Sequence, residues 1–221
     1  MRGKYVDARG SDDHPEHACN ARNVLGSSNA KGITGLPQGA VLKVTSEAII
    51  EAIRAAFAAV PRGAITIHEA EVIDEYGSDD MRAEARLLDS EPSWESVPDA
   101  DIEQCTTALC YLDPLGWRYY IPAYMIWSLR YFRVNTSIVS DFTIYTFDLS
   151  GTDLGIREYK LERYQLLDAA QSRAVCLYLR YMAANEEYAD SESARRALKE
   201  YWGRYCAYQD AEPVTFSEHG S

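Results

Sequence analysis

The stretch Asp113–Phe132, DPLGWRYYIPAYMIWSLRYF, decides the fold that this sequence predicts. Asp113 followed by Pro114 is typical of a helix start, because aspartate caps the first turn and proline is tolerated at the first helical position. Beyond this start, apolar and aromatic side chains occupy almost every face of the helix. A helix that is apolar all round is buried, so we expect the other helices to pack around this one. Pro122 removes one helical hydrogen bond, which predicts a kink near Arg118.

The sequence on both sides of this stretch has a helical period as well. Two capping boxes are expected to open helices, Thr66 with Glu69 and Asp168 with Gln171. A polar helix is expected over residues 79–88. Apolar residues recur at intervals of three and four in several further segments, 46–60, 67–76, 102–109, 169–182 and 191–205.

One segment, residues 137–150, has two possible structures. Residues 143–147 have β propensity, whereas Ile138, Phe142, Tyr145 and Leu149 fit a single helical stripe. Because the neighbouring segments are helical, we favour a helix. The sequence therefore predicts an all-α fold, a single compact domain of six to eight helices around a kinked apolar central helix.

The net charge of the chain restricts the classes of molecule that it can bind. The chain has 221 residues, with 34 acidic and 22 basic side chains and a formal net charge of −12. Nucleic acids and anionic membranes bind basic surfaces, so neither is an expected partner. The longest uncharged apolar run, residues 119–129, is about half the ~20 residues that cross a bilayer, so no transmembrane helix is expected.

The two ends of the chain differ from the helical middle. Residues 1–44 contain 6 of the 13 glycines and a single aromatic residue, a composition that buries little apolar surface. We therefore expect a disordered leader over 1–44, a helical domain over 45–208 and a disordered tail over 209–221. The five cysteines are odd in number, form no C-x-x-C pair and follow no secretory leader, which predicts reduced thiols and a cytoplasmic location.

The segment Leu112–Met125, LDPLGWRYYIPAYM, resembles the signature of an uncharacterised bacterial family of unknown function. In that signature a leucine and a proline-capped turn precede an arginine–aromatic–aromatic–leucine–proline–alanine helix. Asp113 stands where threonine or serine is expected, and it caps equally well. The resemblance extends over residues 45–206. It implies a helical bacterial domain, and it implies no activity and no catalytic residue.

Metal binding is considered at two places, and both have a simpler interpretation. His14, His17 and Cys19 have metal-like spacing, but a zinc site needs ligands held by a folded frame, and these lie in the expected leader. The carboxylates of residues 69–75 and 79–84 are typical of the solvated face of a helix. No metal or cofactor is therefore expected.

Cys105 and Cys110 suggest a thiol nucleophile, with His68 as its base. A reactive thiol needs an electropositive and partly exposed setting, whereas Cys105 falls on an apolar stripe. His68 lies beside Ile67 in the first turn of a capped helix, where a solvated or cap-adjacent histidine is expected. The simpler interpretation is a buried thiol in the core.

The remaining candidates are arginines and tyrosines of the central helix, residue types that are common at binding hot spots and also at the rim of a core. We expect Arg118 either to pair internally with a carboxylate such as Asp113 or to point outward beside a tyrosine. The best-supported function is a non-enzymatic acidic binding or accessory protein that neutralises a basic protein partner. The alternative is a metal- or thiol-dependent enzyme. The candidate binding residues are Arg118, Tyr120, Tyr124, Arg130 and Arg133.

Overall fold

The computed structural model describes residues 45–206 except residue 152, and these form helices and connecting segments without a β-strand. The all-α prediction is confirmed. Nine α-helices are present in this part of the chain, slightly more than the six to eight expected. In chain order they are α1 Ser46–Phe57, α2 Ile67–Asp74, α3 Asp79–Arg86, α4 Asp99–Gln104, α5 Pro114–Tyr131, α6 Val139–Tyr145, α7 Leu154–Gln165, α8 Ala169–Ala183 and α9 Ser191–Glu200.

Three 3-10 turns complete the described elements, η1 Trp94–Ser96, η2 Ala108–Cys110 and η3 Trp202–Tyr205. The ambiguous segment 137–150 contains α6 and is helical, as favoured. The expected leader and the whole of the expected tail lie outside the described residues, as do His14, His17 and Cys19. None of the described helices has the length and apolarity to cross a membrane.

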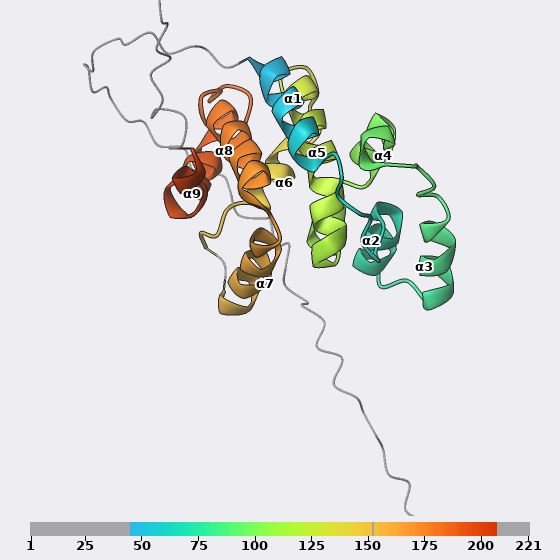
Figure 1. The fold of residues 1–221 in the computed structure, drawn as a ribbon. Helices are drawn as coiled ribbons and strands as arrows, with labels where there is room; N and C mark the ends of the chain where they lie inside the picture. The colour runs from blue at the N-terminus through green and yellow to red at the C-terminus, as the bar shows by residue number, and fades with distance from the viewer. Residues whose placement is uncertain (1–44, 152, 207–221) are drawn as a thin grey trace, which may run out of the picture.

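The central position of α5 is confirmed. Twelve of its 18 residues are buried, and it packs against α1, α4, α6 and α7. Figure 1 shows it between the α1–α8 side and the α2–α4 side of the molecule. Asp113 caps its first turn by accepting a hydrogen bond from the Gly116 amide. The helix continues through Pro122, and the kink expected there stays a prediction.

Two glycines let the segment before α2 reach the start of α5. A Cβ on Gly63 would lie 2.0 Å from the Gly116 backbone nitrogen, so no larger residue fits at position 63. Asp113 also holds the segment before α2 against the start of α5. Its second carboxylate oxygen accepts a hydrogen bond from the Ile65 amide at 2.8 Å. One aspartate therefore caps α5 and anchors the α1–α2 connection.

The end of the described chain, η3, packs against α8 and α9 and contacts α7 through aromatic side chains. Trp202 lies 5.4 Å from Phe147 and 4.6 Å from Tyr164, measured between ring centroids. Its indole N–H donates to the Phe147 carbonyl at 3.1 Å. Cys206 at the end of η3 forms a disulfide with Cys176 of α8. The prediction that all thiols are reduced is therefore wrong for this pair.

Helix α7 is attached by the ring of the buried Tyr164 and by two cations that donate to backbone carbonyls. The Lys160 ammonium donates to the carbonyls of Tyr145 and Asp148 at 2.8 and 2.7 Å, and so covers the end of α6. Arg163 donates to the carbonyls of Leu109 and Leu112 beside η2. Both cations are buried.

Candidate partner-binding surface

Two of the predicted binding residues, Tyr120 and Tyr124, are completely buried in the core. The Tyr124 hydroxyl donates to the Cys105 carbonyl, and the Tyr120 hydroxyl has no partner among the described residues. Their burial follows from the packing of other helices around most of α5.

Arg118 is half-buried and points inward toward α8. Its Nε donates to the side-chain oxygen of Gln171 at 3.1 Å, so the partner is an amide rather than the expected carboxylate. Gln171 also completes the predicted capping box with Asp168, which is confirmed. Arg118 thus joins α5 to the start of α8.

Arg130 and Arg133 are exposed, and they contact different parts of the molecule. Arg133 donates to Asn185 at 2.5 Å and stacks on Phe132. Arg130 lies 3.9 Å from Asp99 and borders a hollow of about 40 Å³ between α1, η1, α4 and α5. Ligand sites usually enclose roughly 300–1,000 Å³, so this hollow is too small for a cofactor. The structure does not bring the five predicted residues together on one face.

The proposed thiol site also differs from what nucleophilic chemistry requires. Cys105 is completely buried, and burial raises the pKa of its thiol, with nearby Glu71 adding to the rise. A catalytic cysteine needs the opposite shift. His68 is buried rather than solvated, and its Nδ1 lies 2.8 Å from Asp89. Among the described residues, no group of three or more His, Cys, Asp or Glu side chains is arranged to hold a metal ion.

The predicted Thr66–Glu69 capping box is wrong, because Glu69 has stronger partners further along the chain. Thr66 occupies the N-cap position, but its hydroxyl makes no hydrogen bond. Glu69 is completely buried and accepts from Arg86 at 2.7 and 2.5 Å and from Arg82 at 3.1 Å. Both arginines belong to α3, so this carboxylate fastens α3 to α2.

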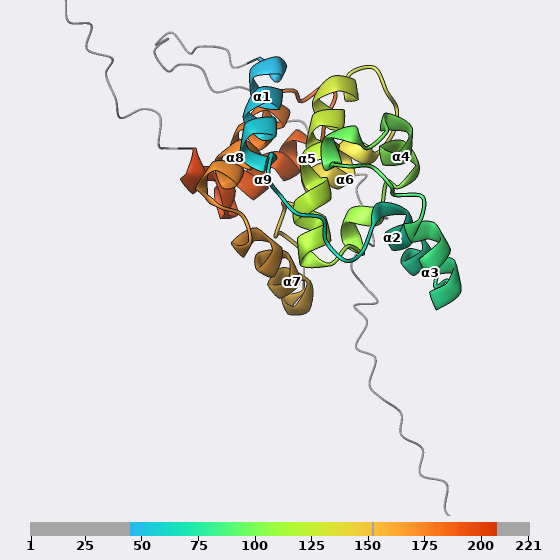
Figure 2. The same ribbon diagram turned by 45° about the vertical axis from the view of Figure 1, so that its right-hand side comes forward.

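Helix α3 lies at the periphery of the molecule. Figures 1 and 2 show it beyond α2, on the side remote from α8 and α9, and α2 is the element that it mainly contacts. Ala85 is its one buried residue. Arg82 and Arg86 face α2, so the basic side of α3 is turned inward.

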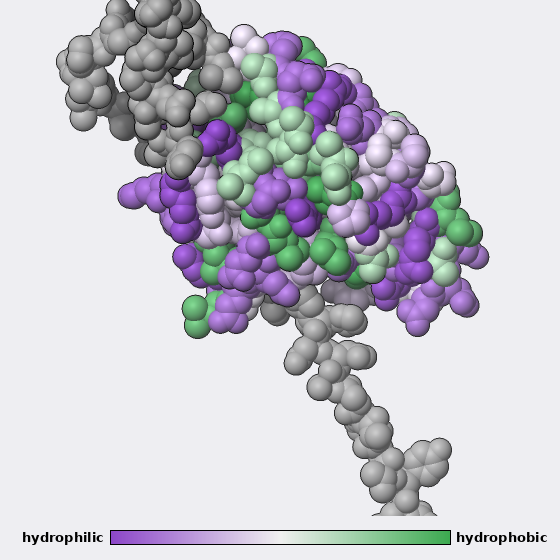
Figure 3. Space-filling view, viewed as in Figure 1, coloured by the Kyte–Doolittle hydropathy of each residue, from purple (hydrophilic) through white to green (hydrophobic). Residues whose placement is uncertain are grey.

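The outward side of α3 combines carboxylates with large apolar side chains. Asp80, Ala83, Glu84 and Leu87 follow the spacing of one helical face, and all four are exposed. Figure 3 shows hydrophobic and hydrophilic patches side by side over the edge where α3 lies. We call the following exposed side chains the α3 surface: Glu75, Tyr76, Asp79, Asp80, Met81, Glu84, Leu87 and Leu88.

Tyr76 lies between α2 and α3 in an unusual backbone conformation. Its φ of 57° is left-handed, and at the end of a helix this position is usually glycine. The Tyr76 and Gly77 amides donate to the carbonyls of Ile73 and Val72, which closes α2. Gly77 remains necessary for a different reason, because a Cβ there would lie 2.4 Å from a Val72 methyl group. The Tyr76 side chain is 83% exposed.

A comparison with models of protein families shows which family the chain belongs to. The model of a family of unknown function, DUF6714, matches residues 45–206. The chain belongs to this family. The DUF6714 match confirms the resemblance to an uncharacterised domain family, and it includes α3. No curated protein and no solved structure matches the chain.

Sequence reasoning treated the α3 segment only as solvated surface and missed its apolar residues. The sequence nevertheless contained a pattern that indicates an exposed apolar surface on this helix. In a strongly polar helix, Leu87 and Leu88 directly follow the last turn, and Met81 precedes Leu88 by seven residues. That spacing puts Met81 and Leu88 on one flank of the helix.

Proposed function

We propose that this protein is a non-enzymatic binding or accessory protein that recognises a basic protein partner through the α3 surface. One observation carries the proposal. Both arginines of α3 are directed to the buried Glu69, which leaves Glu75, Asp80 and Glu84 without an ion-pair partner among the described residues.

Charge segregation of this kind favours binding of cations. From Ile67 to Leu88 the chain has seven carboxylates and two arginines, and both arginines bind the one carboxylate that is completely buried, Glu69. Exposed carboxylates attract a basic partner over about a Debye length, roughly 8 Å at physiological salt, and accelerate encounter. The chain as a whole carries −12, which adds to the attraction.

The proposal includes a bacterial origin and a cytoplasmic location, both of which stay predictions. The Cys176–Cys206 disulfide removes the cysteine argument for the cytoplasm, because disulfides are rare in that compartment.

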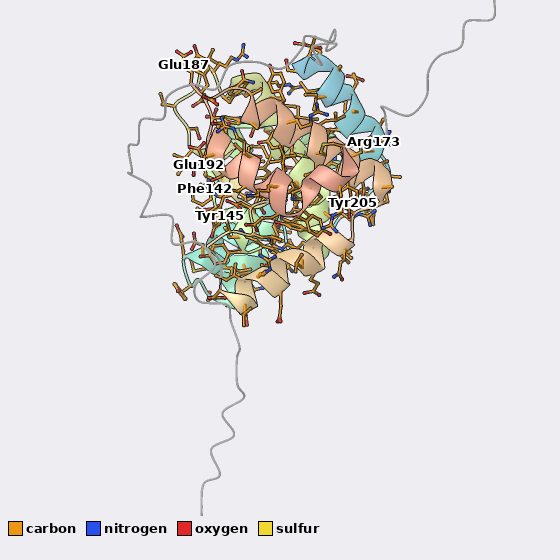
Figure 4. The ribbon with its side chains drawn as sticks, turned by 90° about the vertical axis from the view of Figure 1, so that its left-hand side faces the viewer. Phe142, Tyr145, Arg173, Glu187, Glu192 and Tyr205 are labelled. Atoms are coloured by element: carbon orange, nitrogen blue, oxygen red, sulfur yellow. A yellow bond between two sulfur atoms is a disulfide. The ribbon has the colours of Figure 1, made fainter. Side chains whose placement is uncertain are left out.

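A charge-neutralising variant tests this function. The probe is a fluorescein-labelled, lysine-rich peptide of about 15 residues, and binding is measured by fluorescence anisotropy in low and in physiological salt. Asp80→Asn with Glu84→Gln removes two unpaired carboxylates from α3. The control, Glu187→Gln with Glu192→Gln, removes two exposed carboxylates from the opposite side of the molecule, which faces the viewer in Figure 4, and one of them, Glu192, pairs with Arg196 at 3.2 Å.

The proposal predicts that the α3 variant binds the peptide at least about fivefold more weakly, which corresponds to about 1 kcal/mol. The control variant should change binding by less than about twofold. Absence of binding by the unmodified protein, or an equal loss in both variants, would contradict the proposal.

A further inference from the structure

Exposed apolar side chains are concentrated at α3 to an unusual degree. The described residues contain nine large hydrophobic side chains that are exposed, and four of them lie within the thirteen residues from Tyr76 to Leu88. Leu87 is 79% exposed and Leu88 is 62% exposed. Single exposed leucines are ordinary, whereas a cluster on one element marks a surface that contacts something.

The attachment of α3 does not explain these side chains. The helix is held by the ion pairs of Glu69 and by the burial of Ala85, so its leucines contribute little to the core. Leu87 is centred on the outward stripe with Asp80 and Glu84, while Met81 and Leu88 lie on its flank. Carboxylates therefore border the apolar residues along the whole helix.

The charges restrict what can cover this face. A second copy of the chain would bring carboxylates against carboxylates, an arrangement that costs several kcal/mol across an interface. A nucleic acid or an anionic membrane would be repelled as well. A partner with apolar residues on one side and lysine or arginine beside them matches both parts of the face.

We propose that the α3 surface docks an amphipathic basic helix, with its apolar stripe on Met81, Leu87 and Leu88 and its cations on Asp80 and Glu84. This inference rests on the proposed function and adds to it the shape and the apolar half of the partner. Helix α3 with the two leucines after it is about three turns long, so it matches a helix of roughly 10–15 residues. An interface of this size is small, typical of transient complexes with micromolar dissociation constants.

Two peptides of identical composition separate the inference from the proposed function. One has leucines at helical intervals of three and four with lysines between them, and the other has the same residues in an order without an apolar face. Each is titrated by anisotropy against the full chain, the Leu87→Ser/Leu88→Ser variant, and a control, Val134→Ser/Leu154→Ser. Val134 and Leu154 are as exposed as Leu87 but lie on other elements.

We expect the amphipathic peptide to bind the unmodified chain about tenfold more tightly than the reordered peptide. The Leu87→Ser/Leu88→Ser variant should lose that advantage, and the control variant should keep it. Equal binding of both peptides, or an advantage that survives in the leucine variant, would overturn the inference while the proposed function stands. Binding of neither peptide would overturn both. A thermal melt of each variant establishes that it is folded, as expected for substitutions at exposed positions.

Discussion

Glu69 and Arg86 form a two-point ion pair, in which the arginine Nε and Nη2 donate to the two carboxylate oxygens at 2.7 and 2.5 Å. Arg82 adds a third donor at 3.1 Å. Glu69 is completely buried, while both arginines are partly exposed. This carboxylate therefore determines where α3 sits and which of its sides faces solvent.

Replacement of Glu69 by glutamine should weaken the docking of α3. The amide cannot accept from both arginines with the strength of a carboxylate, and breaking a buried ion pair typically costs about 3–5 kcal/mol. Since the arginines reach solvent, we expect a smaller loss, about 2–3 kcal/mol in urea unfolding. Glu84→Gln, an exposed glutamate of α3, is the control and should change stability by less than about 0.5 kcal/mol.

The same ion pair should make stability fall in acid. Burial opposes the charge on Glu69, but the hydrogen bonds from Arg86 and Arg82 outweigh it and hold the pKa of Glu69 below the ordinary 4.5. A carboxylate with a lowered pKa stabilises the fold above its unfolded pKa and loses that contribution as pH falls through its folded pKa. Unfolding measured between pH 5 and 2 should show a smaller acid loss for Glu69→Gln than for the unmodified chain. Parallel curves would contradict this role.

Lys160 should produce a second rise of stability with pH, in a higher pH range than that of Glu69. Burial lowers its pKa to about 7, with nearby Arg163 contributing and Asp148 opposing. Between that value and the ordinary 10.5, the unfolded chain binds more protons than the folded chain, so stability should rise with pH. The rise should be absent in Lys160→Met, and Lys199→Met, on α9, should retain it. A rise that persists in Lys160→Met would assign the effect to other groups.

Trp127→Ala should be among the most destabilising single substitutions. Its side chain is 1% exposed in the middle of α5, and truncation of a buried tryptophan leaves a cavity that costs roughly 3–5 kcal/mol. Val134→Ala, at an exposed apolar position just beyond α5, should cost almost nothing. A Trp127→Ala protein with unchanged urea midpoint would place this side chain outside the core.

The Cys176–Cys206 disulfide should stabilise the end of the domain. It joins residues 30 apart in sequence, and closure of a loop of that length is worth about 3–4 kcal/mol in the chain-entropy model. The double variant Cys176→Ala/Cys206→Ala should lose about that much in buffer without reductant. Peptide mapping without reduction should recover the linked pair, and free thiols at both positions would refute the bond.

The parts of the fold that were predicted correctly depend on local sequence. The cap of α5 by Asp113 and the capping box of Asp168 with Gln171 involve residues three positions apart, and their chemistry is legible in the sequence. The Thr66–Glu69 box has the same spacing and does not form, because arginines 13 and 17 residues away bind the carboxylate more strongly. Tertiary contacts of this kind leave no local signal.

The same limit applies to the candidate site. Arginine and tyrosine on α5 suggested a binding face, but the helices around α5 bury Tyr120 and Tyr124 completely. The disulfide could not be predicted from cysteine count or spacing, since it depends on how η3 returns to α8. The α3 surface could not be recognised in the sequence, because its carboxylates resemble the ordinary solvated charges of a helix. The acidic outward side of α3 is distinguished from its basic inward side only by the hydrogen bonds of both arginines to Glu69.

The most direct test of the account is an NMR titration of the ¹⁵N-labelled full chain with the amphipathic basic peptide at physiological salt. We predict that amide shifts concentrate in residues 75–88 and leave α9 unchanged, because the partner seats on the α3 surface. Shifts concentrated on α9, or an unchanged spectrum at a large excess of peptide, would contradict the claim that α3 is the docking surface of this domain.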